Sequence, residues 1–309
     1  MRRIIASVVA LFVTLSLHAQ IFVANAYNGT VGEYSFNGSV INASLISGFG
    51  DPSGIASDEN GHLFVTDLAR GTVGEYTTAG VTVNSDLITG LGNPEAIAVA
   101  NGYLYVATST PQTDGAWPYS HIAKYTTSGT LVSSFLSFIG PTSMASDGRG
   151  NFFIASTGSS ANPFGYVDEF TASGNLTGRD LIYGFQKVSQ VALAENGNLY
   201  VTSENFGNVA EYSTSGALIN GNLISGLSDP FAITTDGNGH LLVGNFSNGT
   251  IGEYTLSGTP INSRLITGLS GPWSIVVVPE PQFGIFACGM AGLYWNIHRR
   301  RKIADWLSA

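Results

Sequence analysis

Histidine and cysteine, the side chains best suited to proton transfer and metal binding, are scarce: the 309 residues include five His and one Cys. His62 and His240 occupy equivalent places in two copies of a repeat, which indicates a role in a turn. His121 has no such explanation, and one imidazole without a paired acid is a weak general base. The sequence contains no nucleophile elbow, zinc signature or phosphate-binding loop. It therefore predicts no catalytic residue, no metal ion and no cofactor.

Carboxylates recur in two patterns, and both indicate structural roles. Asp58, Asp147 and Asp236 begin Gly-containing turns that lack the carboxylate density and the closing Glu of a calcium loop. A residue present in nearly every copy of a repeat more often stabilises the repeat unit than binds a single ligand. The acidic residues that share one repeat position are Glu33, Glu75, Glu169, Glu211 and Glu253, with Lys124 in the sixth copy.

The charged residues are few and segregated. Between Gln20 and Pro281 the sequence has six basic and 20 acidic residues, a net charge of −14. An acidic, lysine-poor body repels phosphate backbones, so we expect no nucleic-acid partner. Cys288 lies in a C-terminal apolar segment, which leaves the body without a disulfide framework or a thiolate metal site.

A phrase of the type Gly-Glu-Tyr recurs six times, at steps of 42 to 49 residues. Each copy also holds an apolar run such as Leu63–Val65. Four copies have a later Leu-Ile-Ser/Thr-Gly run, and five have a short run after a Pro, such as Gly54–Ser57. Gly-rich turns separate the runs, and 39 Gly argue against a mostly helical chain. Each copy therefore predicts four short β-strands.

A four-stranded unit of about 42 residues is typical of a propeller blade. The chain begins at the second strand of a blade and ends on an inner strand, Trp273–Val278. We therefore expect this last strand to complete the first blade beside Ile21–Val23 and to close the ring. The sequence predicts an all-β, six-bladed β-propeller of four-stranded blades over residues 20–278. In its Pro-x-x-Ile-Ala and Leu-Tyr-Val phrases the repeat resembles NHL propellers.

Two classes of propeller enzyme are also similar in architecture. Resemblance to sugar lactonases would imply a divalent metal held by Glu, Asn and Asp on the axis, and resemblance to streptogramin lyases would imply His and Glu near it. The inner strands here offer Ile, Ala, Ser and Thr instead. A lyase or lactonase is therefore the minor alternative to a protein without catalytic activity.

Candidate ligand contacts lie where the repeat is interrupted. The connections between second and third strands are long in the third and fourth blades, over 108–120 and 157–164, and they share one face with the Pro-bearing loops. Aromatic rings with Asn and Ser suit a carbohydrate or peptide, although Trp117 and Phe164 could equally pin their own loops. The candidate ligand-binding residues are Trp117, Tyr119, His121, Asn162, Phe164, Phe231 and Trp273.

Residues 1–19 are typical of a secretory signal peptide, with a basic start, the apolar run Ile4–Leu17 and a small residue at the exit. About 14 apolar residues are few for a membrane span, which needs about 20. We expect signal peptidase to cut between Ala19 and Gln20.

The other end of the chain, 279–302, combines the triplet Pro279, Glu280 and Pro281, an apolar run over 283–297, and a basic cluster. The basic residues that would orient a membrane helix by the positive-inside rule are Arg299, Arg300, Arg301 and Lys302. This order of features resembles the PEP-CTERM sorting signal, although an ordinary tail anchor shares its helix and charges. The resemblance implies cleavage near the triplet by an exosortase, a membrane cysteine protease. A short tail, 303–309, follows.

The sequence as a whole predicts an exported protein, transiently anchored in the membrane by its C-terminus and then at the cell surface or extracellular. We expect a non-enzymatic binding or scaffold role, in contact with extracellular polysaccharide or an envelope protein. A purely structural coat protein is the second interpretation.

Overall fold

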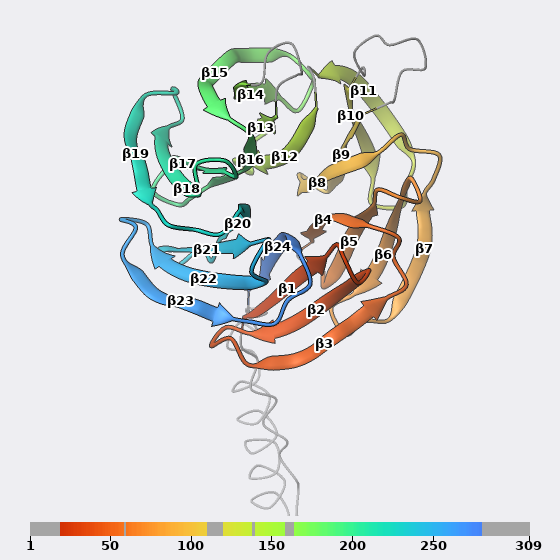
Figure 1. Cartoon of the computed structure of the whole chain (residues 1–309). Helices are drawn as coiled ribbons and strands as arrows, with labels where there is room; N and C mark the ends of the chain where they lie inside the picture. Colours follow the sequence, from red (N-terminus) through yellow and green to blue (C-terminus); the bar gives the residue numbers. More distant parts are fainter. Residues whose placement is uncertain (1–18, 59, 110–119, 138–139, 158–163, 280–309) are drawn as a thin grey trace, which may run out of the picture. The chain divides into compact units, whose positions relative to one another are not determined.

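The computed structural model describes residues 19–58, 60–109, 120–137, 140–157 and 164–279. Within these ranges, 24 strands form six four-stranded antiparallel sheets. The sheets are arranged as blades around a central axis (Figure 1). The predicted all-β, six-bladed propeller is thereby confirmed.

The inner strand of each blade lies beside the axis, and Pro opens five of the six. Pro is tolerated at the first residue of a strand because no ladder hydrogen bond is lost there. The inner strands are β4 (Pro52–Ser57), β8 (Pro94–Ala100), β12 (Pro141–Ser146), β16 (Val188–Leu193), β20 (Pro230–Thr235) and β24 (Pro272–Val278). The second strands are β5 (His62–Asp67), β9 (Tyr103–Ser109), β13 (Asn151–Ser156), β17 (Asn198–Ser203), β21 (His240–Asn245) and β1 (Gln20–Asn25).

The third and outer strands complete each blade. The third strands are β6 (Thr72–Thr77), β10 (Ser120–Thr126), β14 (Phe164–Thr171), β18 (Asn208–Ser213), β22 (Thr250–Thr255) and β2 (Thr30–Ser35). The outer strands are β7 (Thr82–Ile88), β11 (Leu131–Ser137), β15 (Leu176–Gln186), β19 (Leu218–Ile224), β23 (Pro260–Ile266) and β3 (Val40–Ser47). We number the blades along the chain, so that blade 1 holds β24 and β1–β3, blade 2 holds β4–β7, and blade 6 holds β20–β23.

The two ends of the propeller meet in blade 1. Strand β24 pairs antiparallel with β1, from Gln20 opposite Val278 to Ala24 opposite Ser274. Inner strands of neighbouring blades contact one another in the cyclic order β4, β8, β12, β16, β20, β24 and back to β4. The predicted closure of the ring by the last strand is therefore confirmed.

The second strands form the centre of the hydrophobic core. Ile21, Phe22 and Val23 of β1 are fully buried, as are the equivalent residues of β5 and β21. Their side chains point alternately to the two faces of a sheet, and each face is covered by a neighbouring blade. A strand buried on both faces is expected to be apolar throughout, which explains the unbroken Leu-Tyr-Val type of run.

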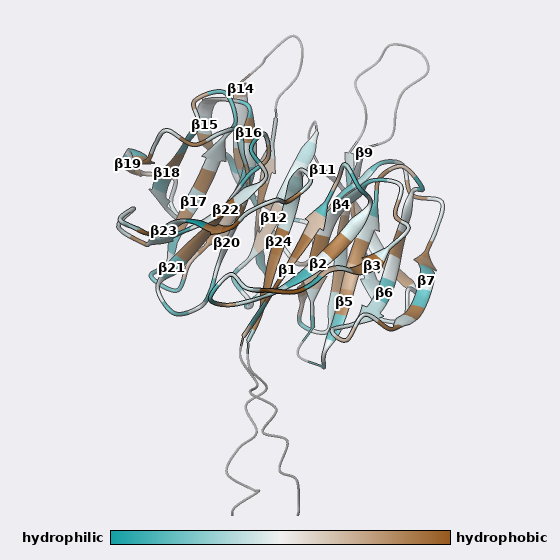
Figure 2. Ribbon diagram, turned by 60° about the horizontal axis from the view of Figure 1, so that its bottom comes forward, coloured by the Kyte–Doolittle hydropathy of each residue, from teal (hydrophilic) through white to brown (hydrophobic). Residues whose placement is uncertain are grey.

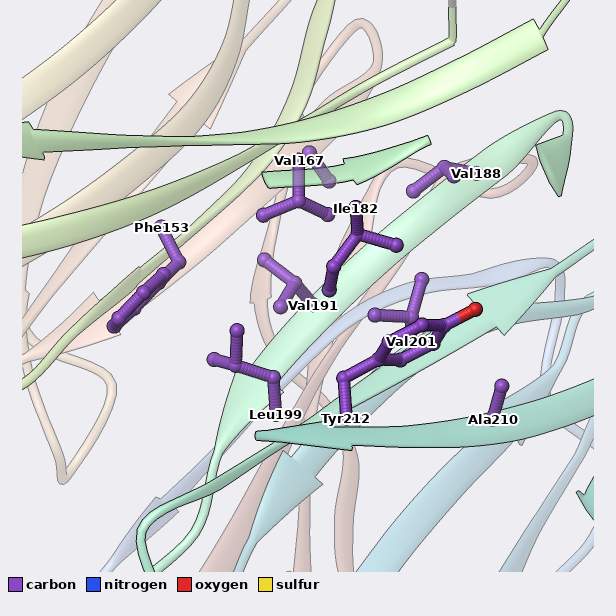
Figure 3. Packing of buried hydrophobic residues seen from close by; sticks show 10 residues of the cluster. Phe153, Val167, Ile182, Val188, Val191, Leu199, Val201, Ala210 and Tyr212 are labelled. Carbon is purple, nitrogen blue, oxygen red and sulfur yellow. The ribbon is translucent and has the colours of Figure 1, made fainter. Parts of the chain in front are cut away.

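The interface between blades 4 and 5 illustrates this packing (Figure 3). Phe153, Val167 and Ile182 of blade 4 contact a layer of blade 5 that includes Val201 and Tyr212. All five side chains are buried. Burial of apolar area between successive blades holds the ring together.

The outer strands are exposed at their beginnings and buried at their ends. Val40 and Ile41 at the start of β3 are exposed, whereas Ile46 near its end is buried. In Figure 2 the hydrophobic segments run through the strands of the blades, and the connecting turns are mostly paler or more hydrophilic.

A glycine in each turn between third and outer strands packs on the preceding blade. In blade 1, Gly38 has φ +84°, and a Cβ there would lie 2.0 Å from the carbonyl oxygen of Leu265 in blade 6. The same arrangement recurs at Gly80, Gly129, Gly174, Gly216 and Gly258, each against the outer strand of the blade before it. Through these six turns each blade contacts the preceding blade at the rim, far from the axis.

Blade 4 departs from the repeat at a buried carboxylate. Asp168 occupies the position of Gly32, Gly74 and Gly252, where the ring and hydroxyl of the Tyr two residues later cover the glycine. Blade 4 has Phe170 at the Tyr position, and the Asp168 carboxylate accepts a hydrogen bond of 2.6 Å from the backbone N–H of Asp180. Burial raises the pKa of Asp168 to about 6.

We expect the Asp168→Asn variant to remove one component of the pH dependence of stability. The folded-state pKa of Asp168 lies above the ordinary pKa of 3.8, so its contribution to stability is present below pH 3.8 and is lost as the pH rises through about 6. Relative to the wild type, Asp168→Asn should gain on the order of 1 kcal/mol in the free energy of unfolding between the two pH values. Urea denaturation of both proteins across this range measures the difference, and parallel pH profiles would contradict the prediction.

The predictions about the two ends of the chain concern residues outside the described ranges, apart from Ala19, Gln20 and Pro279. Gln20 begins β1, and Pro279 is exposed immediately after β24. Within the part of the chain that the structure describes, no helix has the length and apolar character needed to cross a membrane.

Candidate binding site at the mouth of the propeller

Four aromatic side chains, Tyr27, Phe231, Phe246 and Trp273, form a cluster where blades 6 and 1 meet. The ring centroids of Phe231 and Trp273 are 4.2 Å apart, and Phe246 contacts Trp273 nearly at right angles, at 5.6 Å. Tyr27 packs on Phe246 at 4.9 Å and is 72% exposed. Each such pair stabilises by about 0.5–1.5 kcal/mol beyond its buried area. We call these four residues the aromatic cluster.

Two kinds of element supply the aromatic cluster. Phe231 and Trp273 follow the Pro that opens β20 and β24, whereas Tyr27 and Phe246 lie in the loops between second and third strands of blades 1 and 6. Both kinds of loop leave the blade at the same face, because alternate strands reverse direction. The shared face predicted from the sequence thus holds for Phe231 and Trp273.

The loop that carries Tyr27 is fixed against the segment before β24. The backbone N–H of Ala26 donates to the Gly271 carbonyl at 3.0 Å, and that of Tyr27 donates to the Ser270 carbonyl at 3.2 Å. Gly271 has φ +67°, and a Cβ there would lie about 3 Å from both the Tyr27 and Phe246 rings. Gly271 therefore provides the space in which these two rings lie together.

A cavity of about 290 Å³ lies on the axis and is lined by the inner strands. Ser53, Glu95 and Thr142 line it from blades 2, 3 and 4, at the repeat position that Phe231 and Trp273 occupy in blades 6 and 1. Blade 5 has Ser189 at this position, so four blades have polar side chains there and blades 6 and 1 have aromatic rings.

Glu95 is the one carboxylate among the described residues that line this cavity. Burial raises the pKa of its carboxyl group, and the hydrogen bond of 2.6 Å that Ser109 Oγ donates to it opposes the shift. Among the described residues, no three His, Cys, Asp or Glu side chains come close enough to hold a metal ion. The metal-binding arrangement implied by a sugar lactonase is therefore not reproduced in the described lining.

Gln190 connects three inner strands around the cavity. Its Oε1 accepts from the backbone N–H of Ile233 in β20 at 3.1 Å, and its Nε2 donates to the Trp273 carbonyl in β24 at 2.8 Å. The side chain is buried, so both hydrogen bonds are protected from water. Gln190 therefore holds the backbone that carries Trp273 and positions this part of the aromatic cluster.

The recurrent Glu of the third strand is held by a polar residue of the second strand. Glu211 accepts from Asn198 Nδ2 at 2.7 Å, and Glu253 lies 3.5 Å from His240 Nδ1. In blade 3, Lys124 replaces the Glu, and its ammonium lies 3.8 Å above the Tyr103 ring. These pairs support the structural interpretation of the repeated charge, since Tyr103 replaces the polar partner in the one blade where Lys124 replaces the Glu.

The turn aspartates accept hydrogen bonds within their own turns. Asp58 accepts from the backbone N–H of His62 and lies 3.0 Å from its Nδ1, and Asp236 lies 2.9 Å from His240 Nδ1. For Asp58, burial acts to raise the pKa, but the hydrogen bonds from His62 and Asn60 outweigh it, and the pKa is lowered. Both histidines therefore have partners in the turns, as their repeat positions predict.

The candidate residues predicted from the sequence do not all come together. Trp117, Tyr119 and Asn162 lie outside the described residues. His121 lies in β10 of blade 3, and Phe164 begins β14, where its ring is 6.0 Å from that of Tyr183. Only Phe231 and Trp273 belong to the aromatic cluster.

Sequence reasoning missed Tyr27, Phe246, Glu95 and Gln190. Tyr27 and Phe246 could have been found by aligning the short loops of the six blades, which place aromatic residues here in adjacent blades 1 and 6. The contacts of Gln190 have no counterpart in the sequence pattern, because they join strands far apart in the chain.

Comparison with known proteins identifies the fold. No family model and no curated protein matches the chain. A protein of unknown function from Bacteroides caccae is similar in structure, with a TM-score of 0.62 and 14% identity over 84% of this chain and 99% of that one. A gluconolactonase from Xanthomonas campestris matches with a TM-score of 0.57 and 14% identity, over 85% and 87% of the two chains. Virginiamycin B lyase from Staphylococcus aureus matches at 0.51 and 15% identity, over 86% and 76%. At these identities the similarity shows the fold alone, a six-bladed propeller shared with lyases and a lactonase.

Proposed function

We propose that the propeller is an exported, non-enzymatic binding protein that holds extracellular polysaccharide at the aromatic cluster. The observation that carries the proposal is the exposed Tyr27 ring, supported by three further rings, two of which are on inner strands that line the axial cavity. Aromatic faces stack on the C–H faces of sugar rings, and the polar groups nearby can bind sugar hydroxyls. A prearranged ring loses little conformational entropy on binding, which favours affinity.

Export and processing are part of the same proposal. The signal-peptide pattern of residues 1–19 supports removal by signal peptidase, and the Pro279-Glu280-Pro281 triplet with its apolar run and basic cluster supports a PEP-CTERM signal cut by an exosortase. Pro279 is exposed and directly follows β24, so a cut at the triplet would leave all 24 strands in the body. The product would be a cell-surface or extracellular propeller.

Removal of the Tyr27 ring should weaken polysaccharide binding. On a glycan array, we expect Tyr27→Ala to lose about tenfold or more in affinity for the polysaccharides bound by the wild type, because one stacking surface is gone. The thermal midpoint should change little, since the ring is mostly exposed.

Ile41→Ala is the matched control, because it removes an exposed apolar side chain from the outer strand of the same blade. It should bind as the wild type does. A wild-type protein that binds no polysaccharide on the array would overturn the proposal and favour a structural coat protein.

A propeller enzyme is the second candidate, favoured by the partly buried Glu95 carboxyl in the axial cavity and by a fold shared with a gluconolactonase. It predicts hydrolysis of glucono-δ-lactone or opening of a cyclic ester by the wild type. That activity should be lost in Glu95→Gln, which keeps the shape of the side chain but not its charge.

A further inference from the structure

A second hollow, separate from the axial cavity, lies between blades 4 and 5. It has a volume of about 470 Å³ and is lined by β15, the loop before β18, and β18 and β19. The side chains that line it are Tyr183, Phe206, Asn208, Tyr212 and Asn222. We call it the blade 4–5 groove.

The hollow itself is a property of the fold. A groove of about 480 Å³ occurs at the equivalent place between blades 5 and 6, lined by Ser225, Asn248 and Thr250 among others. These three residues occupy the repeat positions of Tyr183, Phe206 and Asn208. The comparison shows what is particular to the blade 4–5 groove: two aromatic rings and an amide replace three small or polar side chains.

These replacements depart from the repeat in a coordinated way. Four other blades have Ser or Thr at the position of Tyr183, and blades 1 and 6 have Asn at the position of Phe206. Blades 1, 2 and 6 have Thr at the position of Asn208. Tyr183 and Phe206 come from different blades, yet they lie on one groove and are 54% and 56% exposed.

The hydrogen bonding of the loop has also changed. In blade 6, Thr250 Oγ1 donates to Asn248 Oδ1 at 2.7 Å and accepts from Asn245 Nδ2 at 3.2 Å, so the three side chains satisfy one another. Blade 1 has the same network. In blade 5, where Phe206 and Asn208 stand in place of Asn248 and Thr250, these bonds cannot form.

Asn208 instead turns toward the outer strand and keeps an unused acceptor. Its Nδ2 donates to the Gly221 carbonyl at 2.9 Å, which fixes the orientation of the amide because a carbonyl can only accept. Its Oδ1 has no partner, although the residue is only 7% exposed. A buried acceptor without a partner costs about 1–3 kcal/mol.

We infer that the blade 4–5 groove is a binding site for a neutral pyranose unit of a saccharide, distinct from the aromatic cluster. The described lining has no charged side chain, which disfavours an acidic or basic ligand. Tyr183 and Phe206 offer ring faces for stacking on the C–H groups of the sugar. The Asn222 amide lines the same groove and offers hydrogen bonds to sugar hydroxyls.

The test uses variants that restore the repeat, so that a loss of binding cannot be attributed to a damaged fold. Maltohexaose, cellohexaose and mannohexaose are titrated into the purified full chain by calorimetry. We expect the wild type to bind at least one of them and Phe206→Asn and Tyr183→Ser to bind it about tenfold or more weakly.

Tyr27→Ala separates this inference from the proposed function, on which it does not depend. Tyr27 lies in blade 1 and does not line the groove, so this variant should bind the hexaose as the wild type does. Unchanged binding in Phe206→Asn and Tyr183→Ser, or no binding of any of the three hexaoses to the wild type, overturns the inference whatever the result at the aromatic cluster.

Discussion

Ending the chain after Gly271 should abolish the cooperative unfolding transition of the propeller. This truncation removes β24 and leaves β1 without its inner partner from Gln20 to Asn25. It also removes the buried Ile275, which packs with Ile21 and Val23, and the Trp273 carbonyl that Gln190 holds. The combined loss is on the order of 5–10 kcal/mol, comparable to the whole stability of a typical domain.

Circular dichroism during heating measures the transition. A chain that ends at Pro279 is the matched control, since it differs only in retaining β24, and it should unfold in one sharp step. A chain ending at Gly271 that unfolds as sharply, and at the same temperature, would show that the ring does not need its last strand. The two truncations also limit where the proposed proteolytic cut can fall. A cut before β24 should unfold the propeller, and a cut after β24 should not.

Gly38→Ala should be the most damaging single substitution in a turn of blade 1. The added Cβ would lie 2.0 Å from the Leu265 carbonyl oxygen, and φ at this position is +84°. Backbone cannot yield as a flexible side chain can, so the turn must move away from blade 6. We expect a loss of about 3 kcal/mol in the free energy of unfolding, from steric displacement and strained φ together.

Gly48→Ala in the same blade is the control for strained φ alone. Gly48 has φ +92°, but a Cβ there would meet nothing within 4 Å. Its loss should be about 1 kcal/mol. Urea denaturation of the two variants measures the difference, and equal losses would show that the contact with Leu265 does not stabilise the ring.

The sequence was sufficient to predict the fold because every blade repeats the same order of four strands around an apolar second strand. The steps of 42 to 49 residues, the apolar second strands and the Pro that opens five of the six inner strands predict four strands per copy. Beginning the count at a second strand predicts that Trp273–Val278 completes blade 1, and the pairing of β24 with β1 confirms it.

The site could be predicted only in part, since a repeat indicates which residues are equivalent but not which of them meet. Phe231 and Trp273 were expected on one face, and they contact one another because their blades are neighbours in the closed ring. Tyr27 joins them from the opposite end of the chain, through the same closure. The departures at Tyr183 and Phe206 are visible in the sequence, but their convergence depends on the packing of blade 4 on blade 5.

Both proposed sites lie on the face where loops leave the second and outer strands. One polysaccharide chain that contacts both would bind more tightly than either site alone, because the second contact is made at a high effective concentration. Affinity should then rise with polymer length, and a double variant of Tyr27 and Phe206 should lose this dependence.

The pairing of β24 with β1 also sets the order in which the molecule can fold. The strands of blades 2 to 6 pair with neighbours in sequence, so each of these blades can form as soon as its own residues are available. Blade 1 cannot, because its inner strand is the last part of the body to be synthesised or translocated. Contacts between distant residues form slowly, since the entropy of closing the chain must be overcome first. Throughout this interval the apolar strand β1 lacks its inner partner, β24, and it is the segment that a holding chaperone would need to protect.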